Sequence, residues 1–313
     1  MEGRTEDKVC TLREAIAQYV RSGESLYLAG MAHGEVSAAV HEILRQEITD
    51  LTLIKPVSEV PSLLVSEGRV KALIHAYTTV LYDRRGYSAK RARERGYLPR
   101  LIEFSHFGLN LALQAGAIGV PYLPAISQLG SDIMTYNTQY LAEAQDPFTG
   151  RKVAAVRAIT PDVGIIYVQK ADKFGNAQKW GTLGMDSAGL HASDRVIVTA
   201  EEVVEMEETR QYPERTLIPG ALVSAVVEEP WGAYPRHLYG YYADDIRTYI
   251  DQIDTEEDTE EGYEEYMREL VYGVECRAEM MEKMRQRYRD EHFKNYRCLR
   301  SNSRLLGSEE LSR

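Results

Sequence analysis

The sequence predicts an α/β fold with an open, largely parallel sheet, helices on both of its faces and a C-terminal α-helical extension. The first observation is an apolar run at residues 163–168, whose length and β-branched content are typical of a buried parallel strand. The second is that similar runs alternate with amphipathic helical patterns over most of residues 11–250. The third is a change of character after residue 250, where acidic residues are dense and a long helical pattern follows.

Short-range signals place the first elements. Thr11 and Glu14 have the spacing of a capping box ahead of an apolar stripe, and Gly23 stands where a helix would end. A short strand is expected at residues 25–28, and the loop at residues 29–34 leads from it into a second helix. Such a loop offers backbone amides and the positive end of a helix dipole to an anion, although it carries no dinucleotide or P-loop fingerprint.

The remaining elements follow in alternation. Apolar, β-branched runs predict strands at residues 51–54, 70–77, 101–105, 153–159, 195–200 and 218–227. Helical patterns are expected around residues 63–64, through residues 109–115 and over residues 263–288. The strongly basic stretch at residues 83–100 favours a solvated helix face over a phosphate-binding one.

The central strand at residues 163–168 ends in a sharp polar turn. Asp172 can accept hydrogen bonds from nearby backbone amides, and Gly175 and Asn176 readily adopt positive φ. Open α/β sheets bind ligands beyond the carboxyl ends of their strands, so this turn is a candidate ligand position. The alternative is an ordinary turn after a core strand.

Composition excludes several classes of protein. A net charge of −11 argues against a nucleic-acid surface, and no apolar run approaches the length needed to span a membrane. The three cysteines are far apart, which fits a reducing, cytoplasmic location and neither a disulfide framework nor a metal site. We expect two units: residues 1–250 as the α/β domain, and residues 251–313 as an acidic, then basic, helical extension and tail.

A polar corner follows the strand expected at residues 101–105. Glu103 and His106 are three residues apart where this strand passes into a helix, which lets both face one cleft. A pair of this kind can share a proton and act as acid and base near neutral pH. The alternative is a surface carboxylate and a helix-start histidine without a catalytic role.

Several motifs together resemble a known family. They are TLREAIAQYVRSG, EILRQEITDLT, EGRVKALIHAYT, AGAIGVPYLP, PDVGIIYVQKADKFGNA, IPGALVSAVVEEPWGAYP and YGYYADD, in this order. Through them the chain resembles the α-subunit of family I coenzyme A transferases, and among these the A-subunit of glutaconate CoA-transferase most closely. The resemblance runs from about Thr11 to about Glu282. It departs from the family at Ala29-Gly30-Met31, where Gly-Gly-Phe is usual, and at Ser37, where a proline is usual.

The resemblance implies a CoA-transferase subunit that works with a β-subunit, in a heterodimer, heterotetramer or heterooctamer. Such enzymes move CoA between an acyl-CoA and a carboxylic or dicarboxylic acid, through a glutamyl-CoA thioester on the β-subunit. The motif of that nucleophilic glutamate is absent from this sequence. A CoA thioester is then a substrate, and no permanently bound cofactor or metal is expected.

The resemblance also implies roles for residues of this chain. Glu103 and His106 are its candidate catalytic residues. The candidate substrate-binding residues are Gly30, Met31, His33, Ser105, Gly130 and Ser131. The apolar side chains expected to keep water from the site are Met31, Phe104, Phe107, Tyr122, Ile126 and Trp231.

Three other functions stay open at this point. One is a subunit of a CoA-thioester hydrolase that opens a ring or cleaves a C–C bond, with His33 or the Glu103–His106 pair activating water. Another is a sugar-phosphate isomerase on the same general fold, with Glu103 as the base. The third is a non-catalytic or regulatory subunit, favoured by the altered loop at Ala29-Gly30-Met31. An adjacent reading frame with the glutamate motif would favour the transferase.

Overall fold

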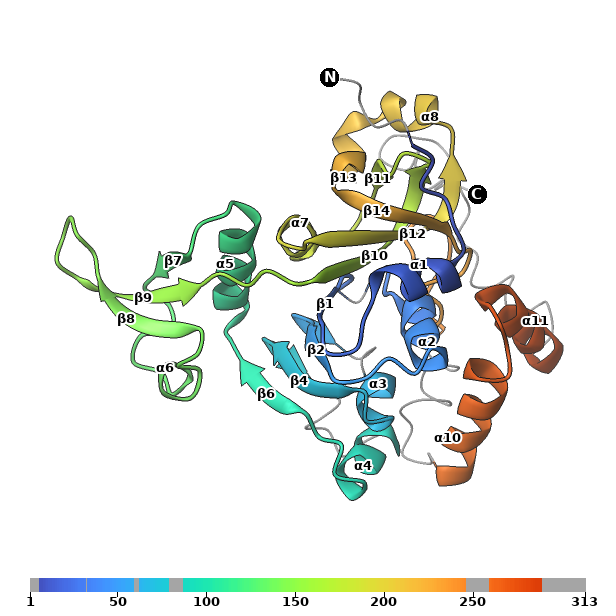
Figure 1. Ribbon diagram of the computed structural model, residues 1–313, viewed down its shortest axis with the longest axis horizontal. Helices are drawn as coiled ribbons and strands as arrows, with labels where there is room; N and C mark the ends of the chain where they lie inside the picture. Colours follow the sequence, from blue (N-terminus) through green and yellow to red (C-terminus); the bar gives the residue numbers. More distant parts are fainter. Residues whose placement is uncertain (1–5, 32, 59–61, 79–86, 246–258, 289–313) are drawn as a thin grey trace, which may run out of the picture.

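The computed structural model describes residues 6–31, 33–58, 62–78, 87–245 and 259–288, without the side chains of Ser58, Thr78, Tyr87, Ala89 and Tyr288. Within these ranges the protein has a main body around one large sheet, and a smaller three-stranded sheet that projects from it (Figure 1). No helix among the described residues combines the length and apolar composition needed to cross a membrane.

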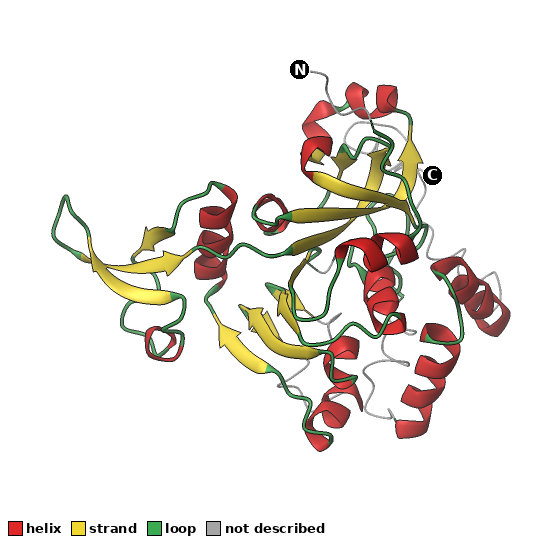
Figure 2. Cartoon of the chain, viewed as in Figure 1, coloured by secondary structure: helices red, strands yellow, loops and turns green. Residues whose placement is uncertain are grey.

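A nine-stranded sheet, here called the main sheet, forms the centre of the described structure (Figures 1 and 2). Its parallel part has the order β14-β12-β10-β1-β2-β4-β6. In addition, β11 pairs antiparallel with the end of β10, and β13 pairs antiparallel with β11. The strands are β1 (Ser25–Leu28), β2 (Leu51–Ile54), β4 (Val70–His75), β6 (Arg100–Glu103), β10 (Val163–Asp172), β11 (Ala177–Gln178), β12 (Arg195–Val204), β13 (Thr216–Ile218) and β14 (Val223–Glu228). The predicted open, largely parallel sheet is confirmed.

Helices cover both faces of the main sheet, as predicted. One face buries apolar side chains of α1 (Leu12–Tyr19), α2 (Ser37–Arg45), α3 (Ser62–Ser66) and α4 (Tyr87–Glu94). The other face is packed by α5 (His106–Ala117) and α7 (Asp186–His191). The capping box of α1 is present: Thr11 Oγ1 accepts the Glu14 amide at 3.2 Å, and the Glu14 carboxylate accepts the Thr11 amide at 2.9 Å.

The central strand β10 is longer than the predicted run at residues 163–168. It is buried almost throughout, and it lies between β1, which pairs with Val163–Ile165, and β12, which runs along its whole length. The predicted turn is confirmed for two of its residues: Asp172 accepts the amides of Phe174 and Asn176 at 3.0 and 3.1 Å, and Gly175 has φ +96°. Asn176 does not adopt positive φ.

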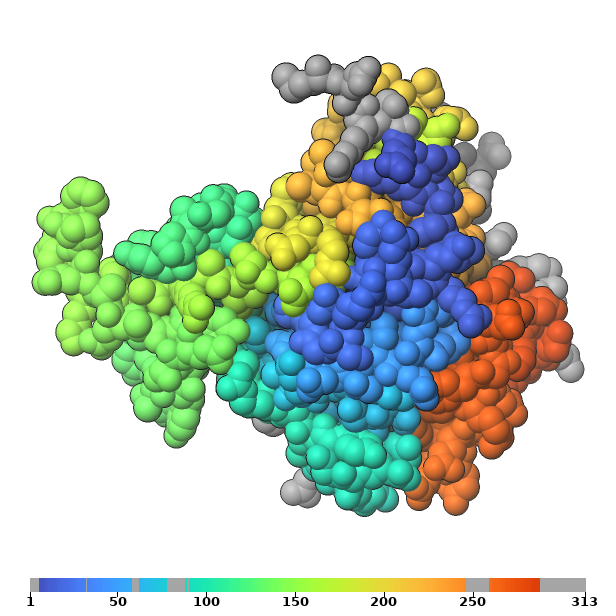
Figure 3. All heavy atoms as spheres, in the orientation of Figure 1, coloured from blue at the N-terminus to red at the C-terminus, as the bar shows by residue number. Residues whose placement is uncertain are grey.

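A second sheet lies outside the main body, and it was not predicted from the sequence. It has the antiparallel order β7-β9-β8 and projects to the left in Figures 1 and 3, with β7 at Tyr122–Ala125, β8 at Leu141–Gln145 and β9 at Lys152–Arg157. The strand predicted at residues 153–159 therefore does not belong to the main sheet. The reason is visible in β9, where only Ala154 and Val156 are buried, and this one-sided alternation is typical of an antiparallel strand with one face to solvent.

The predicted strand at residues 218–227 is interrupted. β13 ends at Ile218, a 3₁₀ turn spans Gly220–Leu222, and β14 begins at Val223. Pro219 has no amide hydrogen for a sheet ladder. Gly220 approaches the main chain so closely that an added Cβ would lie 2.4 Å from the Phe174 carbonyl oxygen. These two residues end one strand and start another.

The C-terminal helical region is present but is not one continuous helix. It consists of α10 (Glu260–Tyr266), a π-helical turn (Met267–Val271) and α11 (Arg277–Tyr288). Tyr263, Val271 and Met284 are buried in the same apolar cluster as α2, so this region packs into the core of the main body. The predicted boundary at residue 250 and the predicted tail lie outside the described residues.

The shorter elements complete the described chain. The strands β3 (Val57–Ser58) and β5 (Tyr77–Thr78) pair with each other. The other short elements are α6 (Ile133–Tyr136), α8 (Met206–Gln211) and a 3₁₀ turn at Pro213–Arg215.

Candidate active site

The loop after β1 lies where the strand order of the main sheet reverses. From β1 the chain proceeds outward through β2, β4 and β6, whereas β10, β12 and β14 proceed outward on the other side. The carboxyl ends of strands at such a switch point are the usual ligand position in open α/β sheets. The loop after β1 therefore occupies the usual position of a ligand site in this kind of sheet.

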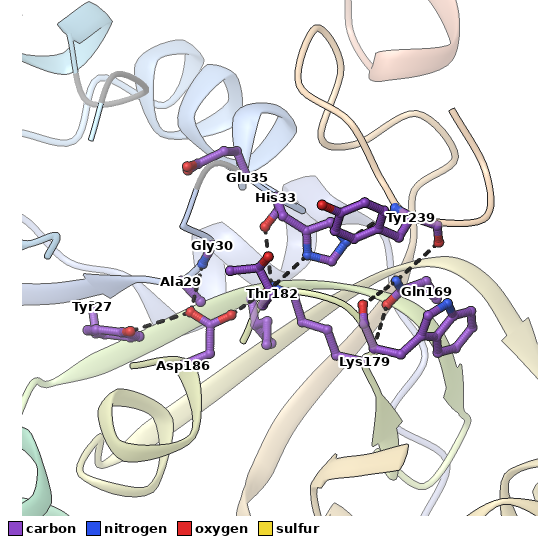
Figure 4. Close-up of polar contacts among 12 residues, drawn as sticks. Tyr27, Ala29, Gly30, His33, Glu35, Gln169, Lys179, Thr182, Asp186 and Tyr239 are labelled. Atoms are coloured by element: carbon purple, nitrogen blue, oxygen red, sulfur yellow. Dashed lines mark hydrogen bonds and ion pairs between the residues drawn. The ribbon is translucent and has the colours of Figure 1, made fainter. Parts of the chain in front are cut away.

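A buried ion pair holds one side of this loop (Figure 4). Lys179 donates to the Asp186 carboxylate at 2.7 Å, and both side chains are at most 2% exposed. The other oxygen of Asp186 accepts the Gly30 amide at 2.8 Å. The Gly30 amide is thus occupied within the chain, so the prediction that it serves as a donor to substrate is not supported by its geometry.

A second buried ion pair holds the other side. Lys55 follows β2 and donates to Glu35 at 2.6 Å, to the Ala29 carbonyl at 3.0 Å and also to the Gly30 carbonyl. The Gly34 amide donates to the His237 carbonyl at 3.0 Å. Charge-assisted bonds of this kind are stronger than neutral ones, so the loop backbone is fixed on both sides.

His33 is buried and not exposed in the loop as an unpaired polar residue. Its Nε2 accepts the Tyr239 amide at 3.2 Å, and its Nδ1 lies 3.3 Å from the Thr182 carbonyl, which fits a neutral imidazole protonated at Nδ1. Burial, together with the nearby Lys179 charge, lowers the pKa of His33 to about 3. Both nitrogens are engaged, so this histidine orders the loop and is poorly placed to activate water. Met31 is half-buried beside Gly184.

The remaining candidate residues meet at another place, the corner after β6. Ser105 caps α5 by accepting the Gly108 amide at 3.0 Å, and the side-chain oxygen of Gln128 accepts the Ser105 amide at 3.4 Å. Ser131 donates its hydroxyl to the Gln128 carbonyl at 2.7 Å, and Gly130 stands beside it with φ +75°. Gln128 therefore joins Ser105 to the predicted turn at residues 130–131.

Glu103 and His106 lie on the exposed rim of this corner. The Glu103 carbonyl accepts the side-chain amide of Asn137 at 2.9 Å, which fixes the free edge of β6. Among the described residues no hydrogen bond or ion pair joins Glu103 to His106, so the proton-sharing pair is not formed in this chain alone. Their catalytic assignment stays a prediction.

The predicted site residues thus form two groups, which we call the loop cluster (Gly30, Met31 and His33) and the corner cluster (Glu103, Ser105, His106, Gly130 and Ser131). Strands β2 and β4 lie between β1 and β6, so the clusters are separated by roughly 14 Å at about 4.8 Å per strand. Both lie at the carboxyl edge of the main sheet. This distance is more than a single small ligand spans.

The turn at the end of β10 is not part of either cluster. Leu28 pairs with Ile165, and β10 runs on to Asp172, about 23 Å further at roughly 3.3 Å per residue. The buried Asp172 carboxylate is used within the protein, by the turn amides, by Asn176 and by the Thr209 hydroxyl at 2.8 Å. The alternative of an ordinary turn describes it better than a ligand position.

The predicted apolar walls are dispersed. Phe104 and Trp231 are buried in core clusters on opposite faces of the main sheet, and Trp231 stacks on Tyr242 with ring centroids 4.5 Å apart. Phe107 and Ile126 are exposed by 55% and 74% on the corner side. They therefore do not enclose one site within this chain.

Sequence reasoning missed three buried polar residues. Lys55 follows β2, His75 is the last residue of β4, and Asp186 begins α7. A signal for the first two was available, since a charged or polar residue directly after an apolar run marks the carboxyl edge of a parallel strand.

Comparison with known proteins gives the same family as the sequence motifs. The family model for coenzyme A transferase matches residues 9–229. The A-subunit of glutaconate CoA-transferase of Acidaminococcus fermentans is 34% identical over 300 residues, covering 88% of this chain and 92% of that protein. The A-subunit of 3-oxoadipate CoA-transferase of Pseudomonas knackmussii is 34% identical over 246 residues, 77% of this chain and 86% of that protein.

Two further relatives widen the comparison. A protein of Archaeoglobus fulgidus is 34% identical over 283 residues, which are 88% of this chain but 62% of that protein, so the chain spans less than two thirds of its length. The cholesterol ring-cleaving hydrolase IpdA subunit of Mycobacterium tuberculosis is 30% identical over 241 residues, 73% of this chain and 81% of that protein.

The fold comparison agrees. The crystal structure of glutaconate coenzyme A-transferase from Acidaminococcus fermentans superposes with a TM-score of 0.81 at 31% identity, over 93% of this chain and 96% of that chain. A family match over most of the chain and relatives of this similarity show that the chain belongs to the coenzyme A transferase family, as its motifs predicted.

Proposed function

We propose that this chain is the A-subunit of a heteromeric CoA-transferase, which moves CoA from an acyl-CoA to a carboxylic acid. The support is its family membership and the names of two relatives, both of which are A-subunits of CoA-transferases. Glutaconate and 3-oxoadipate are dicarboxylates, so we favour a dicarboxylic acid as one substrate. The CoA thioester enters as a substrate, and the cytoplasmic location expected from the cysteines is part of the same proposal.

In the proposed reaction a β-subunit glutamate attacks the thioester carbonyl and expels the CoA thiolate, which leaves a mixed anhydride. The thiolate then attacks the glutamyl carbonyl, releases the first carboxylate and leaves a glutamyl-CoA thioester. The second acid reverses these two steps. Each step passes through a tetrahedral oxyanion, so hydrogen-bond donors must face that oxygen and water must be kept out.

The structural observation that supports this proposal best is that the corner cluster is open to solvent in this chain. The loop cluster is fixed by two buried ion pairs, whereas Glu103 and His106 stand exposed at the other end of the same sheet edge. A reactive anhydride needs a site closed to water, and this chain alone leaves the corner cluster open. A second subunit placed over the edge would close it and bring its glutamate to the acyl group.

Within the closed site, the corner cluster would contact the acyl group. His106 stands at the first turn of α5, where the helix dipole and an imidazole N–H both favour a developing oxyanion. Glu103 would accept or hold a proton on the reacting acid. The carboxylate of a dicarboxylic substrate would meet the exposed amide end of α5.

Substitutions in the corner cluster test this assignment. In the complex with the β-subunit, Glu103→Gln or His106→Ala is expected to lower kcat at least about tenfold and to leave the fold intact, because each removes a group that contacts the reacting acyl group. His191→Ala and Glu143→Gln are matched controls, since both side chains are exposed away from the corner cluster. Wild-type kcat with either corner substitution would remove that residue from the catalytic machinery.

A hydrolase subunit is the second candidate. It is favoured by the exposed Glu103, which stands where it could activate water, and by the similarity to the ring-cleaving hydrolase subunit. In that case the acyl-CoA is consumed without an acceptor acid. A non-catalytic subunit, suggested by the altered loop at Ala29-Gly30-Met31, predicts that no substitution in either cluster changes kcat of the complex.

A further inference from the structure

His75 is the cross-strand neighbour of Glu103. It ends β4, it pairs in register with Glu103 at the end of β6, and its carbonyl accepts the Phe104 amide at 2.9 Å. Paired residues on neighbouring parallel strands direct their side chains to the same face of the sheet. The imidazole of His75 and the carboxylate of Glu103 therefore start side by side at the carboxyl edge of the main sheet.

The imidazole of His75 is buried, and no described residue forms a hydrogen bond with it. It is 1% exposed, and neither of its ring nitrogens has a hydrogen-bond partner among the described residues. A neutral imidazole carries one donor and one acceptor, and native proteins leave few such buried groups unpaired. The other buried histidines have partners: His33 uses both nitrogens, and His41 lies 3.3 Å from the Tyr266 hydroxyl.

Among the described residues, Glu103 is the charged group that acts on His75. Burial lowers the pKa of His75, which keeps the ring neutral near pH 7, and the Glu103 carboxylate acts in the opposite direction. On the side of β2, the Lys55 ammonium is already bound to Glu35 and to two carbonyls. On the outer side of β6, Asn137 holds the Glu103 backbone and leaves its side chain exposed.

We propose that His75 is a positioning residue for Glu103. In the assembled enzyme its ring N–H donates to the Glu103 carboxylate, turns that carboxylate toward the acyl group and satisfies the unpaired imidazole. This inference rests on the proposed function, in which Glu103 contacts the acyl group. It assigns a role to a buried polar group that packing alone does not explain, because an apolar side chain would fill the same space without an unpaired donor.

If His75 positions Glu103, removing its imidazole should lower activity without lowering stability. His75→Leu in the complex with the β-subunit is expected to lower kcat about tenfold with little change in KM, and to leave the thermal midpoint unchanged or higher. His75→Asn and His75→Gln keep an N–H at one or the other ring-nitrogen position, and one of them should recover most of kcat. His41→Leu is the matched control: it removes a buried histidine that has a partner, so it should lower the midpoint and leave kcat unchanged.

A double substitution tests whether His75 acts through Glu103. If it does, His75→Leu combined with Glu103→Gln lowers kcat no further than Glu103→Gln alone. Independent, multiplying effects would overturn the proposal. So would a His75→Leu variant with wild-type kcat, or one in which a lowered midpoint accounts for the whole loss.

A last readout does not depend on activity. With histidine labelled at the ring ¹³C positions, the His75 signal is assigned by its loss in His75→Gln, and its titration is followed by NMR in the complex. Glu103→Gln should lower the pKa of His75, because it removes the neighbouring negative charge. An unchanged titration would overturn the pairing. If the complex shows no CoA transfer but this shift is present, the proposed function fails while the pairing of His75 with Glu103 stands.

Discussion

Asp186→Asn is expected to lower the free energy of unfolding by about 3–5 kcal/mol, the usual cost of removing one partner from a buried ion pair. The Lys179 ammonium would remain in the interior without its counter-charge, since both side chains of the pair are at most 2% exposed. The Asn side-chain oxygen can still accept the Gly30 amide, which donates to Asp186 at 2.8 Å, but its NH₂ group would then face the Lys179 ammonium. The substitution keeps the shape of the side chain, so the effect isolates the charge.

Urea unfolding of the chain, followed by circular dichroism, measures this effect. Glu143→Gln is the matched control, because Glu143 pairs with Lys152 at a similar distance of 2.8 Å but both side chains are more than half exposed. Solvent-exposed pairs contribute little to stability, so the control should leave the unfolding midpoint unchanged. Equal midpoints for Asp186→Asn and the control would show that the pair does not hold the loop.

The isolated chain is expected to show no CoA transfer, and activity should appear when the β-subunit is added. The reason is that the chain lacks the motif of the nucleophilic glutamate and leaves the corner cluster open to water. The measurement incubates the purified chain with an acyl-CoA and an acceptor acid, and follows the new acyl-CoA with and without the β-subunit. Robust turnover by the chain alone, free of any copurifying protein, would contradict the proposed division of labour.

The same prediction extends to solubility. Large apolar side chains are exposed on α5 and the projecting sheet region, among them Ile126 by 74%, Tyr136 by 86% and Phe148 by 93%. Large apolar side chains exposed in such numbers promote aggregation unless a partner covers them. We therefore expect poor solubility of the chain expressed alone and improvement on coexpression with the β-subunit.

The elements whose signals are local were predictable from the sequence. The capping box of Thr11 and Glu14 placed α1, and the runs LTLI and VGIIYV placed β2 and the start of β10, because strands buried on both faces are apolar throughout. β9 was assigned to the wrong sheet, since its alternation was not weighed against the continuous runs. β8, with the pattern LAEAQ, is mostly exposed and gives almost no apolar signal.

The candidate site was predictable only in part. Sequence order placed Glu103 and Ser105 at a strand end, but sheet order decides which strand ends meet, and no local pattern states that β2 and β4 separate β1 from β6. The same limit applies to Asp186, which is distant in sequence from Gly30 and yet accepts its amide. His75 was visible in VKALIHAY, but its importance comes from its unpaired ring nitrogens, which only the folded chain reveals.

Trapping the intermediate tests the central claim most directly. The reconstituted pair of subunits is incubated with acyl-CoA and borohydride, with untreated enzyme and enzyme treated without acyl-CoA as controls. A transferase should be inactivated only when acyl-CoA and borohydride are both present, because borohydride reduces the glutamyl-CoA thioester, and mass spectrometry should find the reduced glutamate on the β-subunit. If acyl-CoA is instead consumed without an acceptor acid and no borohydride-sensitive intermediate forms, the complex is a hydrolase and the transferase proposal is wrong.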